Sequence, residues 1–157
     1  MLLLKYKFRW DFHWLIIMLD DIYNNKIIEF ASNIQHIGRL DNPDSSATKV
    51  SRLCGSKVTV DIKIRDNIIT EFAHDVKACA LGQASSSIMA KNVIGSSKEE
   101  LAEVADIMLN MLKNDGPPPA GKWSDLAFLQ PVKDYKSRHS STMLTFEAVN
   151  EAIEKLK

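Results

Sequence analysis

The sequence predicts an α+β protein, and three observations carry this prediction. Residues 58–65 and 68–74 alternate apolar and polar side chains, as strands that bury one face do. A stripe of apolar residues at helical spacing runs through 97–114, and Ser97 stands three positions before Glu100 as in a capping box. With 157 residues, 45% of them hydrophobic and 25% charged, the chain is long enough for one domain around one core.

Helical and turn signals place the remaining elements in order along the chain. Apolar residues at helical spacing precede Gly38, which is typical of a helix end. The following stretch "LDNPDSSA" has the composition of a turn. The expected elements are a helix at 20–37, a short strand at 47–52, the two alternating strands, a small-residue helix from Cys79 to Gly95, the helix within 97–114, a short helix at 124–129, and a last helix at 141–156.

The two alternating strands are expected to form a hairpin, with a register set by matching their apolar faces. Ile64 then lies opposite Ile68. In the same register Val60 lies opposite Phe72. This leaves three residues for the loop, of which Asn67 is able to take the left-handed conformation that such loops need.

The hairpin register also brings the two cysteines of the chain together. Extended to the open end of the hairpin, it places Cys54 opposite Ala78 and therefore beside Cys79. Cys79 precedes an expected helix, whose unpaired amides stabilise a thiolate, and Gly55 lets the chain turn tightly after Cys54. Two convergent thiols suit a metal or cluster, sulfur handling, or a reversible disulfide. The plainer alternative is a pair of small buried side chains.

Charge and cysteine content narrow the class of function. Lys plus Arg and Asp plus Glu are both 20, so no net charge favours nucleic acid or an anionic membrane as the main partner. Two cysteines are too few for a disulfide framework, and no secretory signal is visible. We therefore expect a cytoplasmic protein that binds neither nucleic acid nor a membrane.

The first stretch of the chain has a different character from the rest. Aromatic and charged residues alternate through "KYKFRWDFHW", and the charges interrupt any apolar run that could span a bilayer. We expect residues 1–17 to be an extension outside the domain, which would then cover 18–157. The alternative is an added strand at the edge of the sheet.

Four stretches of the chain carry a family resemblance. They are "IYNNKIIEFASNIQHIGRL", "LCGSKVTVDIKI", "KACALGQASSSIMAKNVIG" and "DLAFLQPVKDYKSRHSSTMLTF". Together they resemble the iron–sulfur cluster assembly scaffold family, the U-type proteins that include the NifU N-terminal domain, IscU and SufU. The resemblance covers residues 20–157 and is closest to the SufU branch, and the third stretch, similar to the family's second-cysteine motif, is its most specific part.

The resemblance implies both a fold and a function. The implied fold is a small antiparallel sheet of about three strands with helices packed on one face, like SufE and NifU. The implied function is iron–sulfur cluster assembly, with iron or a transient cluster held for transfer to recipient proteins. A protein of this kind is not an enzyme in its own right. Its implied partners are a cysteine desulfurase and the recipient proteins.

The family's metal site, with three cysteines and an aspartate or histidine, is only partly matched. Carried over position by position, Cys54 and Cys79 are retained, whereas Ser56 replaces the aspartate and Ser141 the third cysteine. A serine hydroxyl is a poor ligand for a soft metal. His139 lies on the same segment as Ser141 and could complete the site. The candidate metal ligands are therefore Cys54, Cys79 and His139, for iron or a labile iron–sulfur cluster, with zinc as a further option.

Two other functions stay open at the level of sequence. The chain could keep the scaffold fold without metal, as an interaction protein that regulates a cysteine desulfurase. It could instead use Cys54 and Cys79 as a redox pair. A disulfide between them requires their Cα atoms to lie within about 7 Å.

Overall fold

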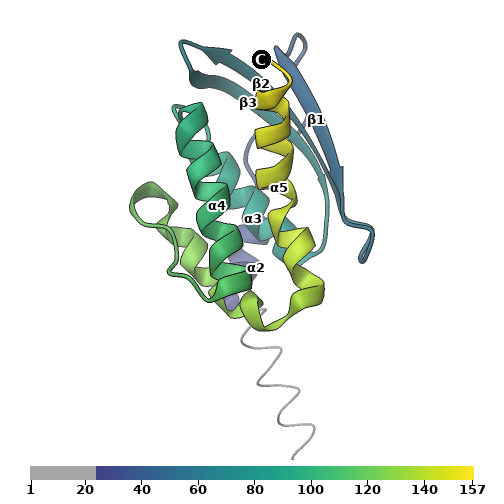
Figure 1. Cartoon of the computed structure of the whole chain (residues 1–157). Helices are drawn as coiled ribbons and strands as arrows, with labels where there is room; N and C mark the ends of the chain where they lie inside the picture. The colour runs from purple at the N-terminus through teal and green to yellow at the C-terminus, as the bar shows by residue number, and fades with distance from the viewer. Residues whose placement is uncertain (1–23) are drawn as a thin grey trace, which may run out of the picture.

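The computed structural model describes residues 24–157, so the proposed extension at 1–17 and its boundary with the domain lie outside the described residues. The described chain forms a three-stranded antiparallel sheet, and its helices pack on one face of that sheet (Figure 1). This arrangement confirms the predicted α+β fold.

The sheet has the strand order β1-β2-β3, with β1 at Ser45–Val50, β2 at Lys57–Arg65 and β3 at Ile68–Lys77. Both neighbouring pairs are antiparallel. The alternate residues Val58, Val60 and Ile62 of the central strand are completely buried in the core. The period-two pattern read from the sequence therefore marks a real buried face.

The hairpin register differs from the expected one. Phe72 lies opposite Ile62, so its predicted pairing with Val60 is wrong. The predicted pairing of Ile64 with Ile68 is wrong as well, because each of them is shifted by one position along the ladder.

The turn between the strands explains this shift. The loop has two residues rather than three, Asp66 and Asn67, and both have positive φ, 51° and 69°. Positive φ at both central residues is the signature of the tight hairpin turn whose twist matches that of the strands. An irregularity between Lys63 and Ile64 then adds a further offset to the ladder. The left-handed conformation expected for Asn67 is confirmed.

Helices supply the rest of the described fold. Ser97 caps one of them by accepting a hydrogen bond from the Glu100 N–H at 3.1 Å, which confirms the capping prediction. The helices are α2 at Asn25–Ser32, α3 at Ala80–Asn92, α4 at Lys98–Asn114, the 3₁₀ helix η1 at Gly121–Asp134, and α5 at Lys136–Glu154.

Several helix boundaries differ from the sequence-based ones. The short helix expected at 124–129 is the longer 3₁₀ helix η1, and the small-residue helix expected to reach Gly95 ends at Asn92. The helix expected at 20–37 ends at Ser32, because the following segment bonds to β3: the Gly38 N–H donates to the His74 carbonyl at 2.9 Å. The last helix begins at Lys136 rather than Ser141, since nothing in "KSRHS" interrupts a helix. Ser141 consequently lies inside α5 and not at its start.

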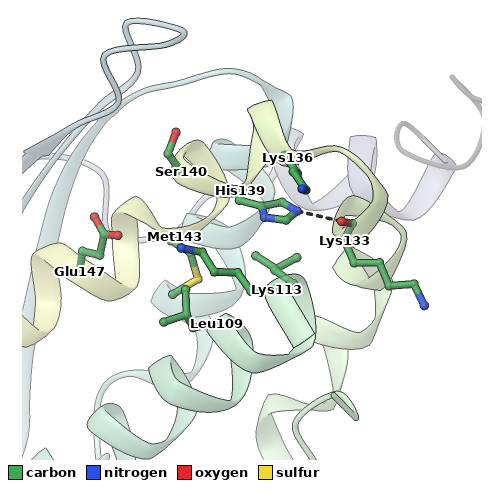
Figure 2. A pocket seen from close by; sticks show the side chains of 9 residues that line it. Leu109, Lys113, Lys133, Lys136, His139, Ser140, Met143 and Glu147 are labelled. Atoms are coloured by element: carbon green, nitrogen blue, oxygen red, sulfur yellow. Dashed lines mark hydrogen bonds between the residues drawn. The ribbon is translucent and has the colours of Figure 1, made fainter. Parts of the chain in front are cut away.

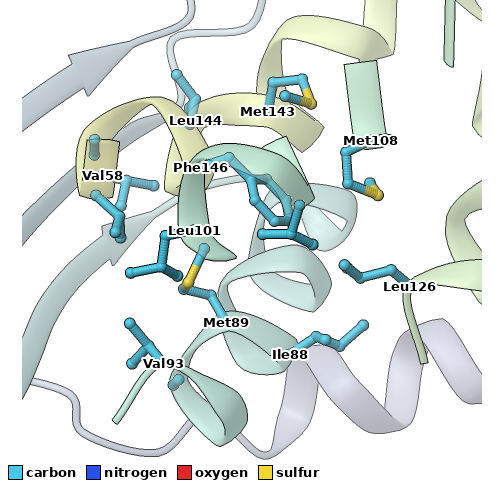
Figure 3. Close-up of a cluster of buried hydrophobic side chains, with 14 of the residues drawn as sticks. Val58, Ile88, Met89, Val93, Leu101, Met108, Leu126, Met143, Leu144 and Phe146 are labelled. Atoms are coloured by element: carbon cyan, nitrogen blue, oxygen red, sulfur yellow. The ribbon is translucent and has the colours of Figure 1, made fainter. Parts of the chain in front are cut away.

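Helix α5 packs directly on the sheet and carries the largest fully buried side chain, Phe146. Figure 3 shows Phe146 in the same buried cluster as Leu101 of α4 and Leu144 of its own helix. Burial of a side chain of this size stabilises the fold by about 1.5–3 kcal/mol. This anchoring fixes the first turns of α5, including Ser141, at one end of the sheet.

Candidate functional site

Cys54 lies in a tight turn between β1 and β2. The Gly55 N–H donates to the Ser51 carbonyl, and the Ser51 N–H donates to the Ser56 carbonyl, both at 2.8 Å. Gly55 has a φ of +72°, which a residue with a side chain rarely adopts. The turn leaves Cys54 exposed to solvent.

Cys79 lies across from this turn, between β3 and α3. It is the residue just before the first turn of α3, as the sequence predicted, and its backbone is extended. Its N–H donates to the Ser56 hydroxyl at 3.3 Å. The Cys79 side chain is partly exposed.

Ser56 connects the two cysteines. The Cys54 thiol lies 3.0 Å from the Ser56 Oγ, the same oxygen that accepts the Cys79 N–H. The two cysteines therefore meet at the open end of the hairpin, as the sequence predicted. The predicted pairing of Cys54 with Ala78 was wrong. Strand β2 begins only at Lys57, so Cys54 lies outside the ladder between β2 and β3.

Ser141 closes the inner side of this pair. It is completely buried, and its hydroxyl accepts from the Cys79 thiol at 3.5 Å and donates to the Arg138 carbonyl at 3.1 Å. A Cβ built on Gly82 would lie 3.2 Å from the Ser141 carbonyl oxygen. The glycine therefore allows α3 and α5 to approach closely enough for Ser141 to reach Cys79.

The hydroxyl groups around Cys54 favour its thiolate. Partial burial raises the pKa of Cys54, but hydrogen bonds from Ser56, Ser51 and Ser141 outweigh this and bring the pKa down to about 7. A large fraction of this thiol is consequently ionised near neutral pH, which is the form that binds metals and attacks electrophiles.

His139 lies apart from the two thiols. Its Nε2 bonds to the carbonyls of Val132 and Lys133, both at 3.0 Å, and the ring lines a pocket of about 530 Å³ beside Met143 (Figure 2). Residues two apart on an α-helix project about 200° from each other, so His139 and Ser141 lie on opposite sides of α5. The structure therefore brings together Cys54 and Cys79 but not His139.

Two serines that sequence reasoning did not single out hold the site together. The Ser51 and Ser140 hydroxyls lie 2.7 Å apart and connect the Cys54 turn with α5. They are 89 positions apart in sequence, and neither belongs to a motif. A correct start for α5 would have placed Ser140 on the helix beside Ser141, but nothing in the sequence points to Ser51.

The donors present do not form a closed metal site. Within residues 24–157, no group of three or more His, Cys, Asp and Glu side chains is placed to hold a metal ion. Structural zinc needs four such ligands in a tetrahedron, so two thiols ringed by hydroxyls do not fit it. Nor does any helix in this part of the chain have the length and apolar character needed to cross a membrane.

The described residues form an α+β domain with a small antiparallel sheet, helices on one face and two thiols at one end. The model of the family described as NifU-like N terminal domain matches residues 22–155, and the chain belongs to this family. The family resemblance seen in the sequence is thereby confirmed.

Individual relatives agree with this assignment. A nitrogen-fixing NifU-like protein (N-terminal) from Brucella abortus is 56% identical in sequence, with a TM-score of 0.87 over 88% of this chain and 96% of that one. The iron–sulfur cluster assembly scaffold protein IscU of Thermotoga maritima is 23% identical over 86% of this chain and 94% of its own. The IscU of Streptococcus pyogenes is 27% identical over 87% and 86%.

Proposed function

We propose that this protein acts in iron–sulfur cluster assembly, holding iron or a transient cluster on Cys54 and Cys79. The observation that carries the proposal is that both cysteines flank the Ser56 hydroxyl, one by its thiol and one by its N–H. Membership of the NifU-like family, and curated relatives named as assembly scaffolds, support the same function.

The site suits cargo that is held briefly. Thiolates are the preferred ligands of iron–sulfur clusters, and the lowered pKa of Cys54 supplies one near neutral pH. Because Cys54 is exposed, a ligand from a recipient protein has room to take its place on the bound iron or cluster. Two protein thiolates with no further strong ligand beside them would release iron or a cluster to a recipient more readily than a closed four-ligand site. Such a protein carries its cargo and catalyses no reaction of its own.

Partners follow from this role. Sulfide for a cluster has to come from a sulfur donor, for which we propose a cysteine desulfurase, and the cargo has to pass to recipient proteins whose cysteines replace Cys54 and Cys79. We place this exchange in the cytoplasm, where thiols stay reduced.

Anaerobic reconstitution with iron and sulfide tests the proposal. A visible charge-transfer absorption is expected in the unaltered protein and is expected to be lost in Cys54→Ser and in Cys79→Ser. The variant His139→Gln serves as the matched control, because His139 bonds to two backbone carbonyls on the other side of α5. The His139→Gln variant should keep the absorption. Loss of the absorption in this variant would show that His139 is a ligand after all.

A second candidate function is a metal-free interaction protein with the same fold. Ser56 and Ser141 favour it, since hydroxyls occupy positions where the family resemblance implies metal ligands. A colourless protein after reconstitution that still binds a desulfurase would support this candidate. A third, the redox pair, predicts that mild oxidation removes two titratable thiols per chain without forming larger species.

A further inference from the structure

A pocket of about 530 Å³ lies where the end of η1 meets α4 and α5, and the thiol site does not use it (Figure 2). We infer that this pocket binds a small carboxylate with an apolar body. Its volume falls within the range of small-molecule sites in proteins, about 300–1,000 Å³. The inference goes beyond the proposed function and does not depend on it. It stands on an apolar middle, a cationic end and a buried histidine.

The middle of the pocket is apolar. Leu109 and Leu112 of α4 line it together with Met143 of α5. Leu112 and Met143 are buried, whereas 40% of Leu109 is exposed. A ligand with an apolar body would cover Leu109, and removal of that apolar surface from water favours binding.

One end of the pocket is cationic. Lys113 from the last turn of α4 and Lys136 from the first turn of α5 both line it. Among residues 24–157 neither of them forms an ion pair within 4.0 Å. Lys133, the third lysine of the lining, is already paired with Asp115 at 2.6 Å. The first turn of α5 adds the partial positive charge of a helix start, so this end of the pocket favours an anion.

His139 supplies a hydrogen-bonding atom at the same end. The residue is only 9% exposed, and its Nε2 bonds to the carbonyls of Val132 and Lys133, so this nitrogen carries the hydrogen. In the described part of the chain the other ring nitrogen, Nδ1, forms no hydrogen bond, and Figure 2 shows it on the side of the ring toward Met143. Once protonated beside a bound anion, Nδ1 donates to a carboxylate oxygen.

Glu147 limits the ligand at the other end. Its side chain lies away from His139 (Figure 2), and the eight positions between them span about 12 Å along α5. A second negative charge on the ligand would be repelled there. The ligand therefore carries one carboxylate at the lysine end and an uncharged apolar chain toward Glu147. No arginine lines the pocket, and arginine is the side chain whose planar fork suits phosphate, so a carboxylate is favoured over a phosphate.

Isothermal titration calorimetry of the full chain with octanoate tests this inference. Octanoate is expected to bind saturably, once per chain. Three related compounds are expected to bind more weakly, by about tenfold or more: acetate lacks the apolar chain, octanamide lacks the charge, and suberate adds a second carboxylate at the far end. Absence of octanoate binding would overturn the inference. Equal affinity for any of the three compounds, or tighter binding of octyl phosphate, would overturn the proposed class of ligand.

Two lysines on the same helix supply matched variants. Lys113→Met should weaken octanoate binding by about fivefold, whereas Lys98→Met, at the opposite end of α4, should leave it unchanged. Both variants lose one positive charge, so a difference between them reports the position of that charge. Equal affinity of the two variants would overturn the location of the site.

Nuclear magnetic resonance locates the ligand without any substitution. The Nδ1 resonance of His139 should move when octanoate is added, while the resonances of the exposed His36 should stay in place. An unchanged His139 signal at saturating octanoate would overturn the site. Octanoate affinity should be the same in the Cys54→Ser/Cys79→Ser variant, which separates this test from that of the proposed function.

Discussion

The Cys79 thiol donates a hydrogen bond to the Ser141 hydroxyl across 3.5 Å. A thiolate at position 141 would therefore lie next to one of the two existing thiols. Position 141 is thus the place where a single substitution would add a third thiolate to the site.

Ser141→Cys is expected to tighten the binding of zinc by more than tenfold, or about 1.4 kcal/mol, because a thiolate replaces a weak hydroxyl ligand. Competition with a chromophoric chelator measures the change. Ser86→Cys is the matched control: Ser86 is buried on α3 and its hydroxyl has no hydrogen-bond partner among residues 24–157, so the new thiol replaces no bond there and lies away from the site. Equal affinity of the two variants would contradict the site geometry.

Replacement of Thr145 or Thr142 on α5 by valine is expected to change the free energy of unfolding in opposite directions. Both are completely buried, but the Thr145 hydroxyl has no hydrogen-bond partner in the described part of the chain, whereas the Thr142 hydroxyl donates to the Arg138 carbonyl at 2.9 Å. Thr145→Val should therefore raise the free energy of unfolding by about 1 kcal/mol, and Thr142→Val should lower it by a similar amount. Urea denaturation measures both, and a loss of stability in Thr145→Val would show that its hydroxyl has a partner.

Alkylation of Cys54 should follow its lowered pKa. Iodoacetamide reacts with the thiolate, so in a Cys79→Ser background the rate of alkylation should rise with pH and inflect at about pH 7. Ser56→Ala removes a hydroxyl that stabilises the thiolate and should move the inflection to higher pH. Ser45→Ala, on β1, is the control and should leave it in place. If the inflection lies at the same pH with and without the Ser56 hydroxyl, that hydroxyl is not the cause of the lowered pKa of Cys54.

His74 should make the protein less stable in mild acid. Burial lowers its pKa, although the hydrogen bond to the Gln35 carbonyl acts in the opposite direction. The folded chain then binds fewer protons than the unfolded chain, whose histidine has a pKa of about 6.5. Above about pH 6.5 the contribution of His74 to the free energy of unfolding is complete. As the pH falls below that value, this contribution is lost at a rate of at most about 1.4 kcal/mol per pH unit.

Urea unfolding at about pH 7.5 and about pH 5.5 compares the two conditions. In His74→Gln the loss of stability between them should be smaller than in the unaltered protein. His36→Asn, in which asparagine tolerates the positive φ of 60°, removes a neighbouring charge that also lowers the pKa of His74 and should make this loss only slightly smaller. The same loss of stability in all three proteins would exclude His74 as the titrating group.

The sequence predicted most of the fold because its strongest signals are local. The strand at β2 and the capping by Ser97 depend on neighbouring residues, and both are confirmed. The hairpin register was wrong because two loop lengths satisfy the same apolar pattern, and the irregularity after Lys63 has no sequence signal. The helix at α2 was drawn too long because hydrogen bonds from Gly38 to β3 compete with helical ones.

The site was predictable only in part, for a similar reason. Cys54 and Cys79 were expected to meet because each lies at the same end of one hairpin, and a register error of two positions does not separate them. His139 was grouped with them because it is near Ser141 in sequence, but the phase of a helix sends residues two apart to different sides. The Ser51–Ser140 contact depends on tertiary packing between β1 and α5, which no local pattern reveals.

The most direct test is the iron and acid-labile sulfide content of the protein purified without oxygen. We predict both elements in the unaltered chain, and neither in the Cys54→Ser/Cys79→Ser variant prepared in parallel. Equal content in the two preparations, or none in either, would contradict cluster binding by the paired thiols.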